Sequence, residues 1–211
     1  IYSKCDIITV HVPAMDATKG MINAEAIAKM KKGVILLNLA RDILANEADV
    51  LAGINSGKIR KYVTENTKIL DVGCGSGILG MLALKFGAKY SVGTDLDPCA
   101  IDATHENMEV NGISKDRYEV MIGNIIDDKE VQDKVGYECY DIVVANILAD
   151  VLVPLTPVIV NQMKPGAVYI TSGIIDDKEQ TVVDAVKAAG LEILEVTYQG
   201  EWVSVTARKQ A

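Results

Sequence analysis

The sequence has few of the residues that build metal sites or disulfide frameworks. It contains two histidines and four scattered cysteines, Cys5, Cys74, Cys99 and Cys139, without a C-x-x-C pair. Zinc sites and small disulfide-stapled domains place such residues at short, regular spacings. We therefore expect free thiols and no metal.

Long apolar runs are missing as well. Hydrophobic residues make up 49% of the chain but are interrupted by charges throughout, whereas a membrane-spanning helix needs about 20 consecutive apolar residues. No basic stretch followed by an apolar segment and a small-residue cleavage site is visible, so no signal peptide is indicated. We expect no membrane partner and a cytoplasmic location.

Positive charge is in deficit. The formal net charge is −8, and no stripe of basic residues interleaved with aromatics offsets it. A nucleic-acid backbone would be repelled by such a chain. We therefore expect no nucleic acid partner, and a basic protein is the macromolecule that the charge favours.

From Lys68 onward, strand and helix patterns alternate. The expected helices are 77–86, 98–111, 148–163 and 177–189, and the expected strands are 68–72, 90–95, 118–122, 141–145, 167–172, 191–199 and 201–209. A "KPG" turn at 164–166 precedes the fifth strand, and the charged stretch 127–134 is read as a solvated helix or loop. The last two strands are separated only by Gly200, which makes them antiparallel. The pattern predicts a doubly wound, Rossmann-like α/β fold with a mostly parallel sheet and one antiparallel C-terminal strand.

The first sixty residues contain a shorter pattern of the same kind. We expect strands at 6–12 and 34–38 and helices at 23–33 and 46–57, capped by Asn23 and Asn46. This is a β-α-β-α half-Rossmann fragment; the pattern leaves residues 58–64 undecided between a strand and an irregular link. Its apolar faces need a cover, which the second sheet or another copy of the chain would provide. A homodimer through this fragment is the prediction if its strands find no sheet edge.

A glycine-rich turn, "LDVGCGSG", carries the clearest functional signal. Gly73, Gly75 and Gly77 follow a strand that ends near Asp71, and glycines let a ligand approach the backbone at the start of a helix. Asp95 ends the next strand about 20 residues later, where a carboxylate can meet the two ribose hydroxyls of an adenosine.

The cofactor has to be chosen between two candidates. Gly75, Gly77 and Gly80 also satisfy the dinucleotide fingerprint G-x-G-x-x-G. However, Gly73 already occupies the position directly after the strand, and Asp71 would repel a pyrophosphate. S-adenosylmethionine carries an ammonium and a sulfonium and has no phosphate, so we favour it.

Residues 64–209 resemble the catalytic domain of the ribosomal protein L11 methyltransferases. The matching segments, in order, are "ILDVGCGSGILG", "GTDLDPCAI", "NGI", "VVANILADVL", "SGII" and "EWVSVTARK". The resemblance implies a class I methyltransferase that uses S-adenosylmethionine to methylate amines of a ribosomal protein. It also implies roles for single residues: Asp71, Gly73 and Gly75 around the methionine moiety, Asp95 on the ribose, Asn124 near the adenine, and Asn146 facing the amine.

Asn146 also has a rationale of its own. It follows an apolar strand at its carboxyl end, the edge where ligands bind in open α/β sheets. Its amide oxygen can accept a hydrogen bond from an amine and orient the nitrogen lone pair. Positioning can carry most of such a reaction because the cofactor supplies the electrophile. The alternative is that Asn146 only caps the strand.

The first sixty residues resemble a different family, the NAD-binding domain of the D-2-hydroxyacid dehydrogenases. The matching segments are "HVP", "KGMINAEAIAKMKKGVILLN" and the "AR" that ends at Arg41. The resemblance places His11 near a nicotinamide and Arg41 on a substrate carboxylate, although Asp42 stands where that family usually has Gly. The family's glycine fingerprint and catalytic domain have no counterpart in this segment, so we expect no hydride transfer.

We interpret the chain as a chimera, engineered or recombined, with domains at 1–63 and 64–211. The leading interpretation is an S-adenosylmethionine-binding methyltransferase domain whose turnover is weakened or lost, because the family's substrate-recognition domain is not seen. The alternatives are a fold chimera without catalysis and a fragment of an NAD-dependent dehydrogenase.

Overall fold

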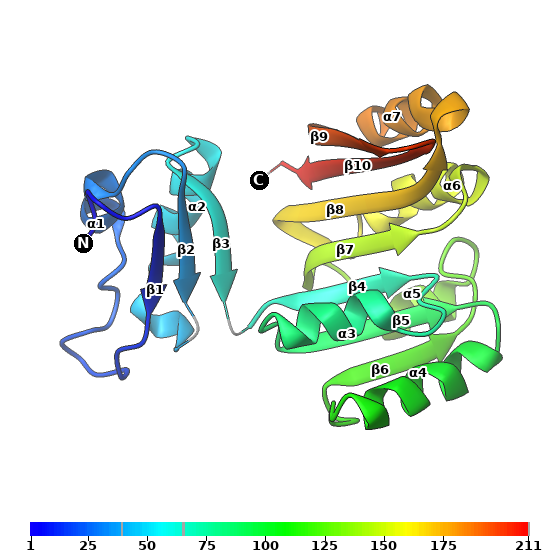
Figure 1. Cartoon of the computed structure of the whole chain (residues 1–211), viewed down its shortest axis with the longest axis horizontal. Coiled ribbons are helices and arrows are strands. Elements are labelled where there is room, and N and C mark those ends of the chain that lie inside the picture. The colour runs from blue at the N-terminus through cyan, green and yellow to red at the C-terminus, as the bar shows by residue number, and fades with distance from the viewer. Residues whose placement is uncertain (39, 65, 211) are drawn as a thin grey trace. The chain divides into compact units, whose positions relative to one another are not determined.

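The chain folds into two compact units in a computed structural model. The structure describes residues 1–38, 40–64 and 66–210. The units are Ile1–Thr67 and Lys68–Ala211, coloured blue to cyan and cyan to red in Figure 1. The boundary that we predicted from the resemblances, between residues 63 and 64, lies at the end of the strand Ile59–Thr64 and stays a prediction.

The N-terminal unit contains a parallel three-stranded sheet in the order β1-β2-β3. Its elements are β1 (Ile7–Val10), α1 (Ala24–Lys29), β2 (Val34–Asn38), a 3-10 helix (Asp42–Leu44), α2 (Glu47–Asn55) and β3 (Ile59–Thr64). The segment that the sequence pattern left undecided is therefore a strand, and it pairs with β2. This third strand extends the β-α-β-α fragment that we expected.

The caps of both helices follow the prediction. Asn23 Oδ1 accepts a hydrogen bond from Ala26 N–H at 3.0 Å, and Asn46 Oδ1 accepts one from Asp49 N–H at 3.1 Å. The predicted end of the first helix at Gly33 is wrong, because the backbone becomes extended at Met30. Met30 buries its side chain in the core of the unit, among residues such as Leu36.

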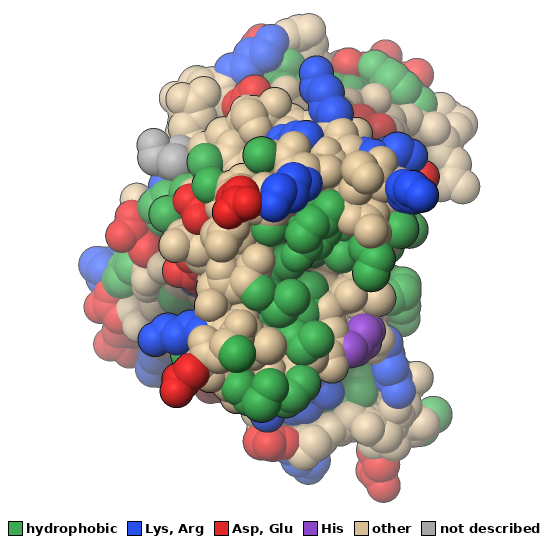
Figure 2. All heavy atoms as spheres, turned by 90° about the vertical axis from the view of Figure 1, so that its left-hand side faces the viewer, with side chains coloured by type: hydrophobic (Ala, Val, Ile, Leu, Met, Phe, Trp, Pro, Cys, Tyr) green, Lys and Arg blue, Asp and Glu red, His purple; other side chains and the backbone are tan. Residues whose placement is uncertain are grey.

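One face of this small sheet carries the core and the other is more open. Along β1, Ile8 and Val10 are buried, whereas Ile7 is 58% exposed. Met15 and Ile43 are also exposed large hydrophobic residues of this unit. Figure 2, drawn from the side on which Figure 1 places β1, shows hydrophobic side chains gathered in a band. The homodimer through this unit stays a prediction.

The C-terminal unit contains a seven-stranded sheet in the order β6-β5-β4-β7-β8-β10-β9. The strands are β4 (Lys68–Val72), β5 (Tyr90–Asp95), β6 (Tyr118–Ile122), β7 (Tyr140–Asn146), β8 (Met163–Ile175), β9 (Leu191–Gln199) and β10 (Trp202–Lys209). β10 is antiparallel to both of its neighbours, and the pairs from β6 to β8 are parallel. The predicted fold class is confirmed.

Helices cover both faces of this sheet, as a doubly wound fold requires. α3 (Ile78–Lys85) and α4 (Cys99–Val110) pack in one apolar cluster. α5 (Lys129–Val135), α6 (Ala149–Ile159) and α7 (Glu179–Ala188) pack in a second, larger cluster. The charged stretch 127–134 thus contributes a helix, which Asp128 caps.

Two predicted boundaries in this unit are wrong. α6 ends at Ile159, before the predicted 163, and the carbonyls of Asn161 and Gln162 accept hydrogen bonds from the chain that enters β7. The "KPG" turn lies inside β8, whose pairing with β7 shifts register between Tyr140 and Ile142. The irregularity interrupts the pairing without ending the strand.

The cysteines, the helices and the metal-ligating side chains of the structure bear on three further expectations. All four cysteines are free thiols, as predicted. No helix within the described ranges is long and apolar enough to cross a membrane. No group of three or more His, Cys, Asp or Glu side chains that could hold a metal ion occurs in the part of the chain that the structure describes.

Candidate functional site

The glycine turn between β4 and α3 is held in place by hydrogen bonds that its own N–H groups donate. Gly73 and Cys74 N–H both donate to Thr94 O, at 2.8 and 3.1 Å. Gly75 N–H donates to Asp95 Oδ2 at 2.8 Å, and Gly77 N–H donates to Cys74 O at 2.8 Å. These donors are therefore already used by the protein and are not free for a ligand.

The glycines of the turn are required for two different reasons. Gly73, Gly75 and Gly77 have φ values of +70°, +51° and +75°, a region that residues with a Cβ rarely adopt. A Cβ on Gly73 would collide with the Ile147 side chain. A Cβ on Gly77 would lie 2.6 Å from Thr104 Cγ2, so this glycine serves the close approach of α4.

Asp71 lies behind the turn and does not line the cavity described below. Its Oδ2 accepts hydrogen bonds from Gly80 N–H at 3.0 Å and from the Tyr118 hydroxyl at 3.2 Å. Its Oδ1 is buried without a hydrogen-bond partner among the described residues. Burial raises the pKa of the Asp71 carboxyl to about 6, although the Gly80 and Tyr118 hydrogen bonds lower it in part.

Asp95 stands at the carboxyl end of β5 and joins the turn to the next loop. Its Oδ2 accepts from Gly75 N–H, and its Oδ1 accepts from Asp97 N–H at 2.9 Å. Each carboxylate oxygen has two lone pairs, so both keep the capacity to accept another hydrogen bond. The side chain is partly exposed and lines the cavity.

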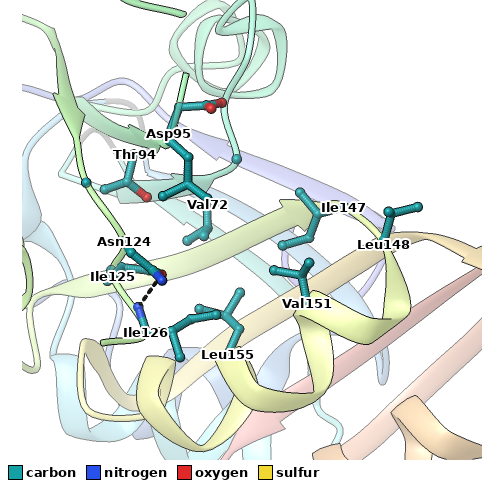
Figure 3. Close-up of a pocket in the computed structure, with 13 residues that line it drawn as sticks. Val72, Thr94, Asp95, Asn124, Ile125, Ile126, Ile147, Leu148, Val151 and Leu155 are labelled. Carbon is teal, nitrogen blue, oxygen red and sulfur yellow. Dashed lines mark hydrogen bonds between the residues drawn. The ribbon is translucent and has the colours of Figure 1, made fainter. Parts of the chain in front are cut away.

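A cavity of about 340 Å³ opens beside this turn, at the carboxyl ends of β4 and β5. Its volume suits a small-molecule site. Figure 3 shows the side chains of the two strands facing those of the β7–α6 connection and of the loop after β6. The lining residues are Val72, Gly73, Thr94, Asp95, Leu96, Gly123, Asn124, Ile125, Ile126, Ile147, Leu148, Val151 and Leu155.

Asn124 lines this cavity, but its side chain is engaged in its own loop. Its Oδ1 accepts from Ile126 N–H at 3.0 Å, the dashed line in Figure 3, and its Nδ2 donates to Asp127 Oδ2 at 3.0 Å. Such an Asx turn holds a short loop in one conformation. Asn124 therefore shapes the wall of the cavity through the loop that it organises.

Asn146 ends β7 and is exposed. No hydrogen bond to its amide is found within the described residues. It does not line the cavity itself, but the next residue, Ile147, does. On β8, a Cβ at Gly173 would lie 3.0 Å from Asn146 Oδ1 and 2.9 Å from Ile147 O, so this glycine permits the close approach of the two strands.

The structure thus divides the seven residues that we expected at the site. Gly73, Asp95 and Asn124 line the cavity, whereas Asp71, Gly75 and Gly77 support it from behind and Asn146 lies beside it. Sequence reasoning missed the apolar wall, which includes Leu96, Ile125 and Val151. The one signal for it was Leu96, an apolar residue placed directly after the acid that ends a strand.

The two residues that resemble a dehydrogenase site lie in the N-terminal unit. His11 is exposed, and its Nε2 lies 2.8 Å from Thr9 Oγ1. Arg41 O accepts a hydrogen bond from Asn38 Nδ2 at 2.8 Å. These contacts are local and join neighbouring residues of the first unit.

Two family models match the chain. The model of the ribosomal protein L11 methyltransferases matches residues 57–210, and that of the NAD-binding domain of D-isomer specific 2-hydroxyacid dehydrogenases matches residues 1–68. Their overlap contains β3. The resemblances that we identified in the two parts of the sequence are confirmed.

Curated relatives and a solved structure agree with the first match. The ribosomal protein L11 methyltransferase of Lachnospira eligens is 59% identical over 154 residues, covering 72% of this chain and 48% of that protein. The same enzyme of Agathobacter rectalis is 56% identical, covering 71% of this chain and 47% of that protein. The chain spans about half the length of these relatives. The ribosomal protein L11 methylase structure from Lactobacillus delbrueckii subsp. bulgaricus is 26% identical with a TM-score of 0.62, covering 83% of this chain and 86% of that one.

A more distant structure shares the fold alone. It is an S-adenosylmethionine dependent methyltransferase from Mesorhizobium loti, 13% identical with a TM-score of 0.53, covering 67% of this chain and 90% of that one. The family match, by contrast, spans β4 to β10 and the whole cavity. Through residues 57–210 the chain belongs to the ribosomal protein L11 methyltransferase family.

Proposed function

We propose that the C-terminal unit binds S-adenosylmethionine in the cavity beside the glycine turn and directs its methyl group to an amine of a basic ribosomal protein. Membership in the family implies this cofactor, and the names of the relatives indicate ribosomal protein L11 as the acceptor. The observation that carries the proposal is the pairing of Gly75 N–H with Asp95 at the mouth of the cavity.

The chemistry of the cavity supports a ligand without phosphate. Among the described residues that line it none is Lys or Arg, and Asp95 is the one carboxylate. The N–H groups of Gly73, Cys74 and Gly75 are already bonded within the protein, so they are not offered to a pyrophosphate. An acidic, apolar cavity with an engaged turn favours a cationic nucleoside over a dinucleotide.

The lining residues fit the parts of such a ligand. Asp95 keeps lone pairs for the ribose hydroxyls, and Leu96 and Ile125 offer apolar surface to a base. Gly73 lets the Ile147 side chain pack directly against the backbone of the turn, which forms part of the apolar lining of the cavity. Asn124 would contribute to the adenine site indirectly, by fixing the conformation of the loop that lines it.

Asn146 is proposed to orient the acceptor. When bound, S-adenosylmethionine supplies an electrophilic methyl carbon. The exposed amide oxygen of Asn146 can accept a hydrogen bond from the amine, which turns the nitrogen lone pair toward the cavity. Methylation turns the amine into an ammonium, and the proton that this ammonium loses passes to solvent, because the amide of Asn146 is not a base.

A basic acceptor agrees with the net charge of −8. The cytoplasm, where ribosomal proteins are found, is the proposed location. We propose no hydride transfer for the N-terminal unit, because the dehydrogenase match covers residues 1–68 and the glycine turn of the chain lies in the other unit.

The test is calorimetric titration of S-adenosylmethionine and, separately, of NAD into the full chain. We expect the first to bind and the second not to bind. Asp95→Asn should weaken S-adenosylmethionine about tenfold or more, because hydrogen bonds to a charged partner contribute about 1.5 to 3 kcal/mol. Asp102→Asn, an exposed acid in the first turn of α4, is the matched control and should bind as wild type.

Binding of NAD without S-adenosylmethionine would overturn the proposed cofactor. Methylation is then measured by transfer of labelled methyl groups to isolated ribosomal protein L11. A chain that binds the cofactor and labels no protein would support the fold chimera without catalysis.

A further inference from the structure

Exposed apolar side chains flank the amide of Asn146 on both sides. Leu148, two residues further along the chain, is 69% exposed. On the other side lies Gly173 of β8, where a Cβ would be 3.0 Å from Asn146 Oδ1. The strand continues from this glycine to Ile175, which is 42% exposed. Ile175 lies directly opposite Trp202 of β10, which is 48% exposed. We call Leu148, Ile175 and Trp202 the apolar strip.

The pairing of Ile175 with Trp202 makes these two side chains one surface. Opposed residues of antiparallel strands lie on the same face, with their Cβ atoms about 5 Å apart. Trp202 is the only tryptophan of the chain. A half-exposed tryptophan beside a half-exposed isoleucine is a common composition for the energetic centre of a protein interface.

Acidic residues surround the apolar strip. Asp150 lies two residues after Leu148, Asp176 directly follows Ile175, and Glu201 directly precedes Trp202. Asp176 N–H donates to Glu201 O at 3.0 Å, which brings these two acids together. Within the described residues 146–150, 172–178 and 199–203, Lys178 is the only cation, and its Nζ lies 3.2 Å from Asp150 Oδ1.

We propose that the apolar strip and its acids dock a short segment of the acceptor protein in which lysine or arginine residues flank the acceptor amine and an apolar side chain packs on Ile175 and Trp202. The proposal rests on the proposed function, since it places the acceptor beside Asn146. The acids would attract the basic residues, and the exposed apolar surface would be buried against the apolar side chain of the segment. A membrane surface or a nucleic acid carries phosphates that these acids repel.

The experiment measures binding of a fluorescein-labelled nonapeptide to the full chain by anisotropy. The probe has lysines on both sides of a central lysine-leucine pair, and the comparison peptide has glutamates in place of the flanking lysines. We expect the lysine peptide to bind and the glutamate peptide to bind at least tenfold more weakly. Equal binding of the two peptides would overturn the proposal.

Substitutions then locate the site. Trp202→Ala and Ile175→Ser should each weaken the lysine peptide about fivefold or more, as expected for the centre of an interface. Phe86→Ser is the matched control, because Phe86 is an exposed apolar residue of the same unit, 77% exposed, at the end of α3. Unchanged affinity in both strip variants, or an equal loss in the control, contradicts the proposal.

Two further measurements keep the result unambiguous. Glu201→Gln alters only an exposed side chain and should weaken the peptide and reduce its salt dependence even if a strip variant fails to fold. S-adenosylmethionine is titrated into the same samples. Cofactor binding without peptide binding overturns the docking surface and leaves the proposed function standing; peptide binding without cofactor binding does the reverse.

Discussion

The hydroxyl of Tyr118 donates a hydrogen bond to Asp71 Oδ2 at 3.2 Å, inside the core of the C-terminal unit. The same oxygen accepts from Gly80 N–H in α3, so the carboxylate joins β6, β4 and the helix that follows the glycine turn. Asp71 and Tyr118 are each 1% exposed. The pair therefore holds the turn from within the protein.

Asp71 should make the stability of this unit depend on pH. Its folded-state pKa of about 6 lies above the ordinary value of 3.8. The stability that it contributes is fully present below pH 3.8 and is lost as the pH rises through 6. We expect the free energy of unfolding of wild type, relative to Asp71→Asn, to fall by the order of 3 kcal/mol between pH 4 and pH 7, since one pKa unit is 1.36 kcal/mol. Urea unfolding followed by Trp202 fluorescence measures it, and a difference that does not change with pH contradicts it.

Tyr118→Phe should move that transition. The Tyr118 hydrogen bond lowers the pKa of Asp71, so its removal raises the pKa further and shifts the midpoint of the stability loss to higher pH. The variant should also lose about 1 to 3 kcal/mol at pH 7, because a buried acceptor is left with one donor fewer. Tyr137→Phe, an exposed tyrosine at the end of α5, is the control. If the pH midpoint of the stability loss does not change in Tyr118→Phe, the hydrogen bond from Tyr118 has little effect on the pKa of Asp71.

Gly73 and Gly75 should respond differently to alanine. In Gly75→Ala the new Cβ has no atom within 4 Å, so only the positive φ is unfavourable. The free energy of unfolding should fall by about 1 to 2 kcal/mol. Gly73→Ala has the same backbone cost, and its new Cβ also collides with Ile147, so its loss should be larger by about 1 to 3 kcal/mol. Urea unfolding of the two variants side by side makes the comparison. Equal losses would mean that Ile147 moves aside freely.

Asn146→Ala should separate binding from catalysis. Because the amide of Asn146 stands outside the cavity, we expect S-adenosylmethionine affinity to stay within about twofold. Methyl transfer should fall about a hundredfold, as when one positioning hydrogen bond is removed from an active site. Asn111→Ala, at the end of α4, is the control. If Asn146→Ala transfers methyl groups at the wild-type rate, Asn146 has no role in the reaction and only caps the strand.

The open face of the small sheet should lead to self-association. Light scattering of the full chain at high concentration is expected to give twice the monomer mass of 22.7 kDa. Ile7→Asp, on the exposed face of β1, should return the chain to a monomer, whereas Val110→Asp on α4 should not. A monomeric wild type at the same concentration would exclude the predicted dimer.

Local signals predicted most of the elements correctly. Asn23 and Asn46 cap the helices that they were expected to cap, because an Asx side chain needs only a neighbouring N–H. The reversed strand β10 followed from the very short connection to β9, which in the structure is Gly200 and Glu201. An error lies where the chain contacts a distant segment, as after the end of α6, where the carbonyls of Asn161 and Gln162 bond to the residues that lead into β7.

The candidate site was predicted less completely than the fold. The spacing of Gly73 and Asp95 places both on one cavity, since the carboxyl ends of neighbouring parallel strands meet at one edge. The apolar wall formed by Ile125, Val151 and Leu155 comes from two separate stretches, the loop after β6 and α6, and has no motif of its own. Asp71 was expected beside the ligand and is found buried behind the turn.

The sequence by itself determined the fold class, the two family resemblances and the strand ends where a ligand can bind, because these depend on periodicity, turn residues and local motifs. Only the tertiary structure decided which N–H groups of the glycine turn are engaged, that residues 59–64 form a third strand, and that Trp202 lies opposite Ile175. Each of these depends on the register of strands far apart in the sequence, which packing sets and local pattern does not encode.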